Sequence, residues 1–195
     1  MGALNAEPLK SLAQLAAKKY GVTDFIETGT HEGTSAAFAA SIFPRVTTIE
    51  ISDVYRQTAI ARHGKLGIRF LLGDSRTVLP PVVKELEKSA FFWLDGHAGG
   101  GNYGTHEDCP VLAELAAIAD SPYEHFVLVD DARAFVAPPP PPFRAEAWPT
   151  LPEIFDVIRR KTKYYCVVLN DAVFCVPPAA KEDMIALCTM ARPKI

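Results

Sequence analysis

The chain has 195 residues, of which 49% are hydrophobic and 22% charged, the composition of a folded globular domain and not of a disordered segment. Its 20 Lys and Arg against 23 Asp and Glu give a net charge of -3, so no broad basic face is available for nucleic acid. There is no leader-like segment and no apolar run long enough to span a membrane. We therefore expect a cytoplasmic protein with reduced cysteines that binds neither nucleic acid nor membrane.

The first predicted element is an amphipathic helix over residues 8 to 20, inside an N-terminal segment 1–22 of one domain, 1–195. Gly21 is placed to end this helix. The apolar residues that define its buried face recur at helical spacing: Leu9, Leu12, Leu15 and Ala16.

Five short apolar runs follow, and a stretch of helical pattern comes after each of them. The runs are almost continuously apolar, as strands covered by helices on both faces must be. This alternation predicts a parallel sheet with right-handed crossovers. The predicted strands are Asp24–Thr28, Arg45–Ile51, Ile68–Leu72, Ala90–Leu94 and His125–Val129.

Two more strands, Tyr164–Leu169 and Ala172–Val176, are separated by two residues, which suits a hairpin and is too short for a parallel crossover. The predicted fold is α/β: a Rossmann-like, doubly wound, mostly parallel seven-stranded sheet with an antiparallel C-terminal hairpin. The hairpin register places Cys166 opposite Cys175, close enough for a disulfide. In a reducing cytoplasm both cysteines are also well explained as small apolar core residues.

A proline-rich segment, residues 136–148, contains five consecutive prolines from Pro138 to Pro142. Such a run adopts polyproline II and joins neither helix nor sheet, so we expect a stiff surface loop after the fifth strand. It fits a spacer, a docking site for a proline-reading domain, or a rim over a substrate pocket.

A glycine-containing loop follows the first strand. Gly29 and Gly33 permit a tight turn and close approach of a ligand to the backbone. Thr34 or Ser35 is expected to cap the next helix, predicted from Ala36 to residue 42. The GxxxG spacing is neither GxGxxG nor a phosphate-binding P-loop, because no Lys follows the second glycine.

Acidic residues end three successive strands. Glu27 ends the first, Glu50 the second, and Asp74, before Ser75, the third. A carboxylate at the second position can accept hydrogen bonds from both ribose hydroxyls, and one at the third can receive an adenine amine. The pattern predicts a site for a cofactor that is cationic at one end and carries an adenine nucleoside at the other.

A second acidic group follows the fourth and fifth strands, where Asp95 should lie near Asp130 and Asp131. Converging carboxylates repel unless a cation neutralises them, and oxygen ligands favour Mg²⁺. Consecutive strand residues face opposite sides, so this requires that the strand has turned by then. His97 is a candidate proton acceptor on a flexible loop. The plainer alternative is that the acids cap helices or pair with Arg133.

These segments together resemble the motifs of a bacterial class I S-adenosylmethionine (SAM) dependent methyltransferase group that acts on polysaccharide and natural-product sugars. The resemblance spans about Asp24 to Phe135 and rests on ETGTHEGTS, TIEIS, GDS, WLDGHAGG, CPVLAEL and VLVDDARAF. The predicted SAM site comprises Glu27, Thr28, Gly29, Thr30, Gly33, Thr34, Ser35, Glu50, Ile51, Ser52, Asp74, Ser75 and Asp95. The predicted metal ligands are Asp95, Asp130 and Asp131, and the predicted catalytic residues are His97, Asp95 and Arg133.

The resemblance implies methyl transfer to a hydroxyl of a small-molecule acceptor, a sugar or other polyhydroxylated metabolite, assisted by a divalent ion such as Mg²⁺. Two alternatives stay open: a degenerate SAM- or nucleotide-binding domain that acts through partners, and an NAD-dependent oxidoreductase, which the GxxxG loop disfavours. Whether the chain forms a homo-oligomer is not determined by its sequence.

Overall fold

The computed structural model describes residues 4–98 and 109–191. The strands are β1 (Asp24–Thr28), β2 (Arg45–Glu50), β3 (Arg69–Leu72), β4 (Phe91–Leu94), β5 (Phe126–Val129), β6 (Tyr165–Leu169) and β7 (Ala172–Val176). The helices are α1 (Leu9–Tyr20), α2 (Thr34–Ala39), α3 (Asp53–His63), α4 (Ser75–Lys84), α5 (Val111–Ala119), α6 (Arg133–Val136), α7 (Leu151–Ile158) and α8 (Lys181–Ala191).

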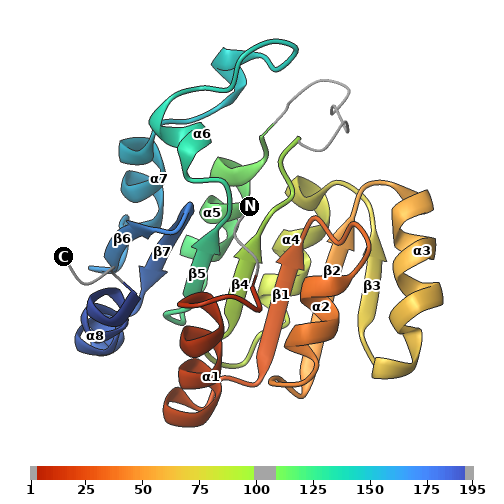
Figure 1. Cartoon of the computed structure of the whole chain (residues 1–195), viewed down its shortest axis with the longest axis horizontal. Coiled ribbons are helices and arrows are strands. Elements are labelled where there is room, and N and C mark those ends of the chain that lie inside the picture. The colour runs from red at the N-terminus through yellow and green to blue at the C-terminus, as the bar shows by residue number, and fades with distance from the viewer. Residues whose placement is uncertain (1–3, 99–108, 192–195) are drawn as a thin grey trace.

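The strands form one seven-stranded sheet in the order β3-β2-β1-β4-β5-β7-β6 (Figure 1). Strands β1 to β5 are parallel, and β7 runs antiparallel to both β5 and β6. The predicted topology, including the terminal hairpin, is confirmed. Strand ends differ from the prediction by about one residue, and the difference that bears on function is Ile51, which lies beyond the end of β2.

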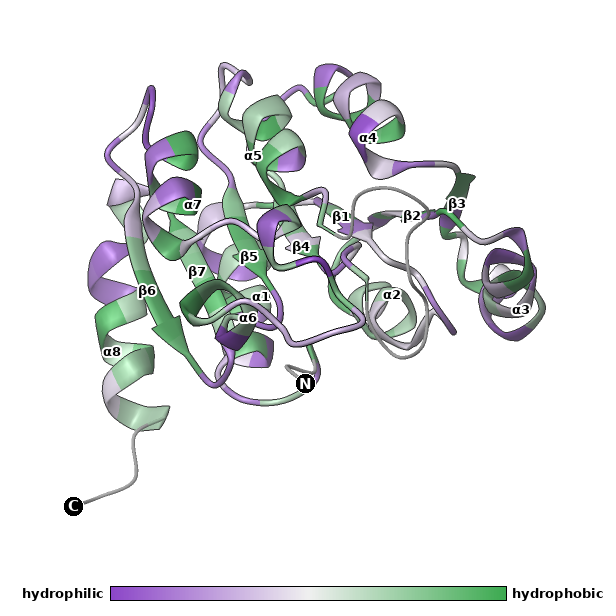
Figure 2. Cartoon of the chain, turned by 90° about the horizontal axis from the view of Figure 1, so that it is seen from above, coloured by the Kyte–Doolittle hydropathy of each residue, from purple (hydrophilic) through white to green (hydrophobic). Residues whose placement is uncertain are grey.

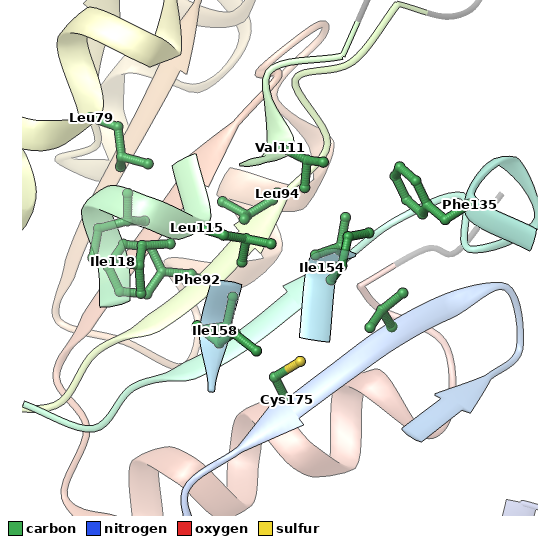
Figure 3. Close-up of a cluster of buried hydrophobic side chains, with 14 of the residues drawn as sticks. Leu79, Phe92, Leu94, Val111, Leu115, Ile118, Phe135, Ile154, Ile158 and Cys175 are labelled. Carbon is green, nitrogen blue, oxygen red and sulfur yellow. The ribbon is translucent and has the colours of Figure 1, made fainter. Parts of the chain in front are cut away.

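Helices cover both faces of the sheet, as Figure 2 shows from above. The side chains of successive β4 residues point to opposite faces of the sheet. Phe91 and Trp93 pack in the core beneath α1, α2 and α8, whereas Phe92 and Leu94 pack beneath α4, α5 and α7 (Figure 3). This burial on both faces is the physical reason for the nearly continuous apolar runs.

The helix caps follow the prediction at one place and not at another. Gly21 ends α1 in the left-handed conformation, with φ of 65°, as expected. At α2, however, the N-cap is Gly33, and Thr34 and Ser35 are the first two helical residues, so their predicted capping role was wrong. A Cβ at Gly33 would lie 3.0 Å from atoms of α3, so this glycine serves close packing.

The proline-rich segment lies on the surface, with four of its five consecutive prolines exposed, which confirms the predicted loop. Its first residue, Val136, ends α6, and within it Phe143 and Trp148 pack against a core cluster before Thr150 caps α7. In the described part of the chain, no helix combines the length and the apolar character that a membrane crossing needs.

His125, just before β5, is a buried histidine with a clear consequence for stability. Its Nδ1 accepts a hydrogen bond from the Ala90 amide (3.0 Å), and the Tyr164 hydroxyl accepts one from the His125 amide (2.8 Å). Burial lowers the pKa of His125 to about 4. The unfolded chain, with a pKa near 6.5, therefore binds more protons between pH 6.5 and 4.

We expect this residue to reduce the free energy of unfolding by about 3 kcal/mol as the pH falls from 6.5 to 4. The measurement is urea unfolding at several pH values for the natural chain and for His125→Gln, whose amide oxygen can accept the same bond. The natural chain should show the steeper loss. Equal pH slopes would contradict the assignment, and His63→Gln serves as the control.

Candidate active site

The carboxyl ends of the parallel strands meet along one edge of the sheet, the upper edge in Figure 1. Backbone hydrogen bonds continue past the strands at this edge. The Asp95 amide donates to the Thr28 carbonyl (3.0 Å), and the Asp130 amide donates to the Leu94 carbonyl (3.0 Å). The loops after β1, β4 and β5 are thereby fixed side by side, which brings the predicted acidic residues together.

Glu27 is buried within this edge. Its side chain is 1% exposed, and Thr48 donates a hydrogen bond to its Oε2 (2.6 Å). The hydroxyls of Thr48 and Thr30 are also hydrogen-bonded (2.6 Å). Burial raises the pKa of Glu27 to about 8, and the Glu50 carboxylate adds to the rise. Glu27 is thus a buried residue beneath the site, hydrogen-bonded to Thr48. Its predicted contact with a cofactor ammonium stays a prediction.

Glu50 lies at the end of β2 with both carboxylate oxygens engaged by backbone amides. Oε2 accepts from His31 (2.8 Å) and Oε1 accepts from Ser52 (2.9 Å). Because each carboxylate oxygen has a second lone pair, Glu50 can still accept hydrogen bonds from a ligand. His31, at a φ of 47°, places its amide toward the carboxylate. The geometry suits recognition of a pair of hydroxyls.

Three exposed apolar residues, Ile51, Val54 and Leu72, belong to the segments next to Glu50 and are called the apolar ledge below. Ile51 is 65% exposed, and its two partners are also exposed. Leu72 lies opposite Glu50 in the β2–β3 register, so the ledge and the carboxylate are immediate neighbours. Exposed apolar side chains in a cluster at a strand edge are typical of a ligand-binding surface.

Asp74 and Ser75 follow β3 but face protein groups. Asp74 caps α4 and pairs with the Arg76 guanidinium (2.7 Å), which lowers the pKa of the carboxyl. The Ser75 hydroxyl bonds to the buried Glu114 of α5, whose pKa burial raises to about 7. Asp74 is thus held in an ion pair with Arg76. Its predicted contact with adenine stays a prediction.

Glu114 is a site residue that the sequence interpretation missed. A Cβ at Gly96 would lie 3.1 Å from Thr28 Oγ1 and 3.2 Å from Glu114 Oε1, so the loop after β4 passes directly over these side chains. The signal was present, because Glu114 is an acidic residue on the buried face of an otherwise apolar helix. Its partners come from distant segments, and periodicity does not reveal them.

Asp95 is at the centre of the acidic residues, with 36% of its side chain exposed. Burial raises its pKa to about 9, and the carboxyls of Asp130, Glu27, Asp131 and Glu114 add to the rise in that order. Acidic groups from several elements therefore converge on Asp95. Two of them, Asp130 and Asp131, which follow β5, were predicted from the sequence. With a pKa of about 9, Asp95 holds its proton at neutral pH unless a cation binds beside it.

His97 lies beside Asp95 but is not open to solvent, contrary to the expected flexible placement. Its side chain is 4% exposed, with Nε2 3.7 Å from Asp95 Oδ1 and 3.9 Å from Asp131 Oδ2. The ring packs against Trp148 and Phe135, with centroid distances of 5.2 and 6.3 Å. Burial lowers its pKa, so the imidazole is neutral at physiological pH. The glycine run after it lies outside the described residues.

The chain has turned directly after β5, as the predicted convergence requires, because Asp131 has a φ of 54°. Arg133 pairs with Asp131 (2.8 Å) and with Asp171, and its amide donates to Asp171 Oδ1 (2.9 Å). Asp171 was interpreted only as a turn residue. It reaches the site because β7 is antiparallel to β5, which places the hairpin turn at the carboxyl edge.

The carboxylates of Asp95, Asp130 and Asp131 have the chemistry that Mg²⁺ prefers, but their arrangement does not form a ligand set. Asp130 Oδ1 accepts from the Asp131 amide (2.8 Å), and Asp131 Oδ1 pairs with Arg133. Within residues 4–98 and 109–191, no group of three or more His, Cys, Asp or Glu side chains is placed to hold a metal ion. We derive no chemical step through a metal.

No protein-family model and no curated protein matches the chain in sequence. Solved structures do match in fold. The O-methyltransferase TomG from Streptomyces achromogenes, in complex with SAM, is 16% identical with a TM-score of 0.60, over 88% of this chain and 81% of TomG. A Bacillus cereus O-methyltransferase in complex with SAH is 14% identical with a TM-score of 0.62, over 90% of this chain and 84% of its own.

A third structure, the SAH-bound methyltransferase PaMTH1 of Podospora anserina, is 14% identical with a TM-score of 0.58, over 88% of this chain and 79% of its own. The strand order and the extent of these matches together show that the chain has the Rossmann-like fold of class I SAM-dependent methyltransferases.

Proposed function

We propose that the protein transfers a methyl group from SAM to a hydroxyl of a small molecule, a sugar or another polyhydroxylated metabolite. The observation that carries the proposal is the juxtaposition of Glu50, the apolar ledge and Asp95 at one edge of this fold. Glu50 offers acceptors for the ribose hydroxyls, and the ledge offers a flat apolar surface for adenine. The SAM- and SAH-bound structures of the same fold support this choice of cofactor.

The charge of the site also favours a sulfonium cofactor. Asp95 lies among carboxyls that raise its pKa, so a cation nearby is stabilised. SAM supplies a methyl group on a positively charged sulfur when bound. Adenine dinucleotides carry two negatively charged phosphates, which carboxylates at this site would repel.

The acceptor hydroxyl would bind at the side of the Asp95–His97 pair, whose Oδ1 and Nε2 atoms are 3.7 Å apart, once the buried imidazole opens toward it. His97 Nε2 would take the hydroxyl proton, and SAM, when bound, would supply the methyl group to the hydroxyl oxygen and leave as SAH. Trp148 and Phe135 exclude water around the imidazole, and Asp95 orients the hydroxyl. Positioning supplies much of the rate in such a transfer.

The test is calorimetric titration with SAH followed by a methyl-transfer assay with a panel of sugars. We expect micromolar SAH binding and no binding of NAD⁺. Binding of NAD⁺ without SAH would favour an oxidoreductase, and SAH binding with no turnover on any acceptor would favour a non-catalytic domain acting through partners.

A divalent ion is a separate part of the proposal, which rests on the chemistry of the carboxylates at the ends of β4 and β5 and requires them to move into a ligand set. It is tested by adding EDTA and then restoring Mg²⁺ in the same assay. If the ion assists, turnover should fall on chelation and return with Mg²⁺, while SAH affinity stays constant. Unchanged turnover would assign the hydroxyl activation to protein groups.

Glu50→Gln is expected to weaken SAH binding by roughly 10- to 100-fold, since a charge-assisted hydrogen bond contributes about 1.5 to 3 kcal/mol. The substitution also replaces one of the two carboxylate oxygens with an NH₂ group, so that one of the two backbone amides loses its acceptor. Calorimetry measures the affinity, with the exposed Glu87→Gln as the control. Equal affinities in the two variants, with unfolding curves unchanged, would exclude Glu50 from the cofactor site.

A further inference from the structure

The C-terminal hairpin holds two cysteines directly opposite each other, with Cys166 paired to Cys175 in the β6–β7 register. The turn residues Asn170 and Asp171 have φ of 48° and 64°, the left-handed pair of a two-residue type I′ turn. Such a turn is closed by a hydrogen-bonded residue pair, and the pairs then alternate along an antiparallel ladder. Counting from Leu169 and Ala172, the cysteines form a non-hydrogen-bonded pair.

This pair type brings the cysteines close together. In non-hydrogen-bonded pairs the Cα atoms are about 4.5 Å apart, inside the range of about 4.4 to 6.8 Å that disulfides span. Both residues are free thiols here. A bond between them therefore requires no movement of the strands.

The two thiols differ in environment. Cys175 is fully buried and points into the core cluster beside Ile158 (Figure 3), whereas Cys166 is partly exposed. Arg159 donates from Nε to the Tyr164 carbonyl (3.1 Å), which holds its guanidinium at the start of β6. The pKa of Cys166 is lowered, first by a hydrogen bond from Cys175 and then by the charge of Arg159. The same contact raises the pKa of Cys175.

We propose that Cys166 and Cys175 form a peroxide-reactive thiol pair that closes to a cross-strand disulfide. The arrangement has the parts that such chemistry needs: an accessible thiol beside a guanidinium, and a second thiol within bonding reach. It lies outside the methyltransferase site and does not depend on the proposed function.

The chemistry balances with hydrogen peroxide as the oxidant. The Cys166 thiolate attacks one peroxide oxygen, the O–O bond breaks, and hydroxide leaves, which gives a sulfenic acid. The Cys175 sulfur then displaces the hydroxyl of that sulfenic acid, losing its proton, and water leaves as the S–S bond forms. The two thiols give up two electrons and the peroxide accepts them.

The experiment treats the folded, reduced chain with hydrogen peroxide, alkylates it with iodoacetamide in denaturant, and digests it with trypsin. Cleavage after Lys163 and Lys181 leaves both cysteines in one peptide, residues 164–181. If the disulfide forms, this peptide is lighter by two hydrogen atoms and carries no alkyl group, and dithiothreitol reverses the change. A doubly alkylated peptide, with Cys109 and Cys188 oxidised instead, would overturn the proposal.

Variants separate the role of Cys166, which reacts with peroxide, from the role of Cys175, which closes the disulfide. Cys109→Ser/Cys188→Ser should still form the bond, whereas Cys175→Ala should stop at a Cys166 sulfenic acid that dimedone labels. Arg159→Gln should slow the first step several-fold at neutral pH, and the neighbouring Arg160→Gln, which alters an exposed pair with Asp120, should not. Equal rates in the two arginine variants, or no dimedone label on Cys166, would count against an activated thiol.

Discussion

Replacement of His97 by glutamine is expected to lower the rate of the proposed methyl transfer by roughly 10²- to 10⁴-fold, the usual contribution of a positioned general base. Glutamine retains hydrogen-bonding groups of similar size but cannot take the hydroxyl proton. The side chain lies between Asp95 and Asp131 and against Trp148, so no other base is held at the same point in the described residues. SAH affinity should stay within a few-fold of the natural value, because His97 does not adjoin Glu50 or the apolar ledge.

Single-turnover kinetics at saturating SAM, together with calorimetry, would measure both effects. His63→Gln, at the end of α3, is the matched control and should have natural turnover. A His97→Gln enzyme with an unchanged rate would remove the imidazole from the mechanism. An equal loss of SAH affinity and rate would instead place it in cofactor binding.

Gly29→Ala is expected to destabilise the fold by at least about 3 kcal/mol, as overpacking and left-handed backbone strain add. Gly29 has a φ of 82°, and a Cβ there would lie 2.0 Å from the Asp95 carbonyl oxygen. The clash is with backbone, which cannot rotate away. The loop after β1 would have to separate from the end of β4, so SAH binding should be lost as well.

Gly21→Ala measures the conformational part of this effect without the steric part. Gly21 has a similar φ of 65°, but nothing lies within 4 Å of a Cβ placed there. Its substitution should cost about 1 kcal/mol, the conformational term alone. Urea unfolding of the two variants measures the difference, and equal losses would show that the contact between Gly29 and Asp95 is not rigid in solution.

The tertiary structure also changed the meaning of several predicted residues. Gly29 was expected to admit a ligand, and a Cβ placed there would meet the backbone of Asp95. Asp74 was expected to face adenine, and it pairs with Arg76 two residues later. His97 was placed on an open loop, and it is buried against Trp148. Only for His97 was the expected environment wrong, and the predicted ligand contacts of Gly29 and Asp74 stay predictions.

The sequence by itself determined the order of strands and helices, the parallel sheet with its terminal hairpin, and the edge at which Glu27, Glu50 and Asp95 meet. These follow from local hydrophobic patterns, because parallel strands covered by helices must end at a common edge. Only the tertiary structure decided that Asp171 pairs with Arg133, that Glu114 lies beneath Gly96, and that Trp148 covers His97. Those contacts join segments distant in the chain, and their energies depend on burial and packing that no local pattern encodes.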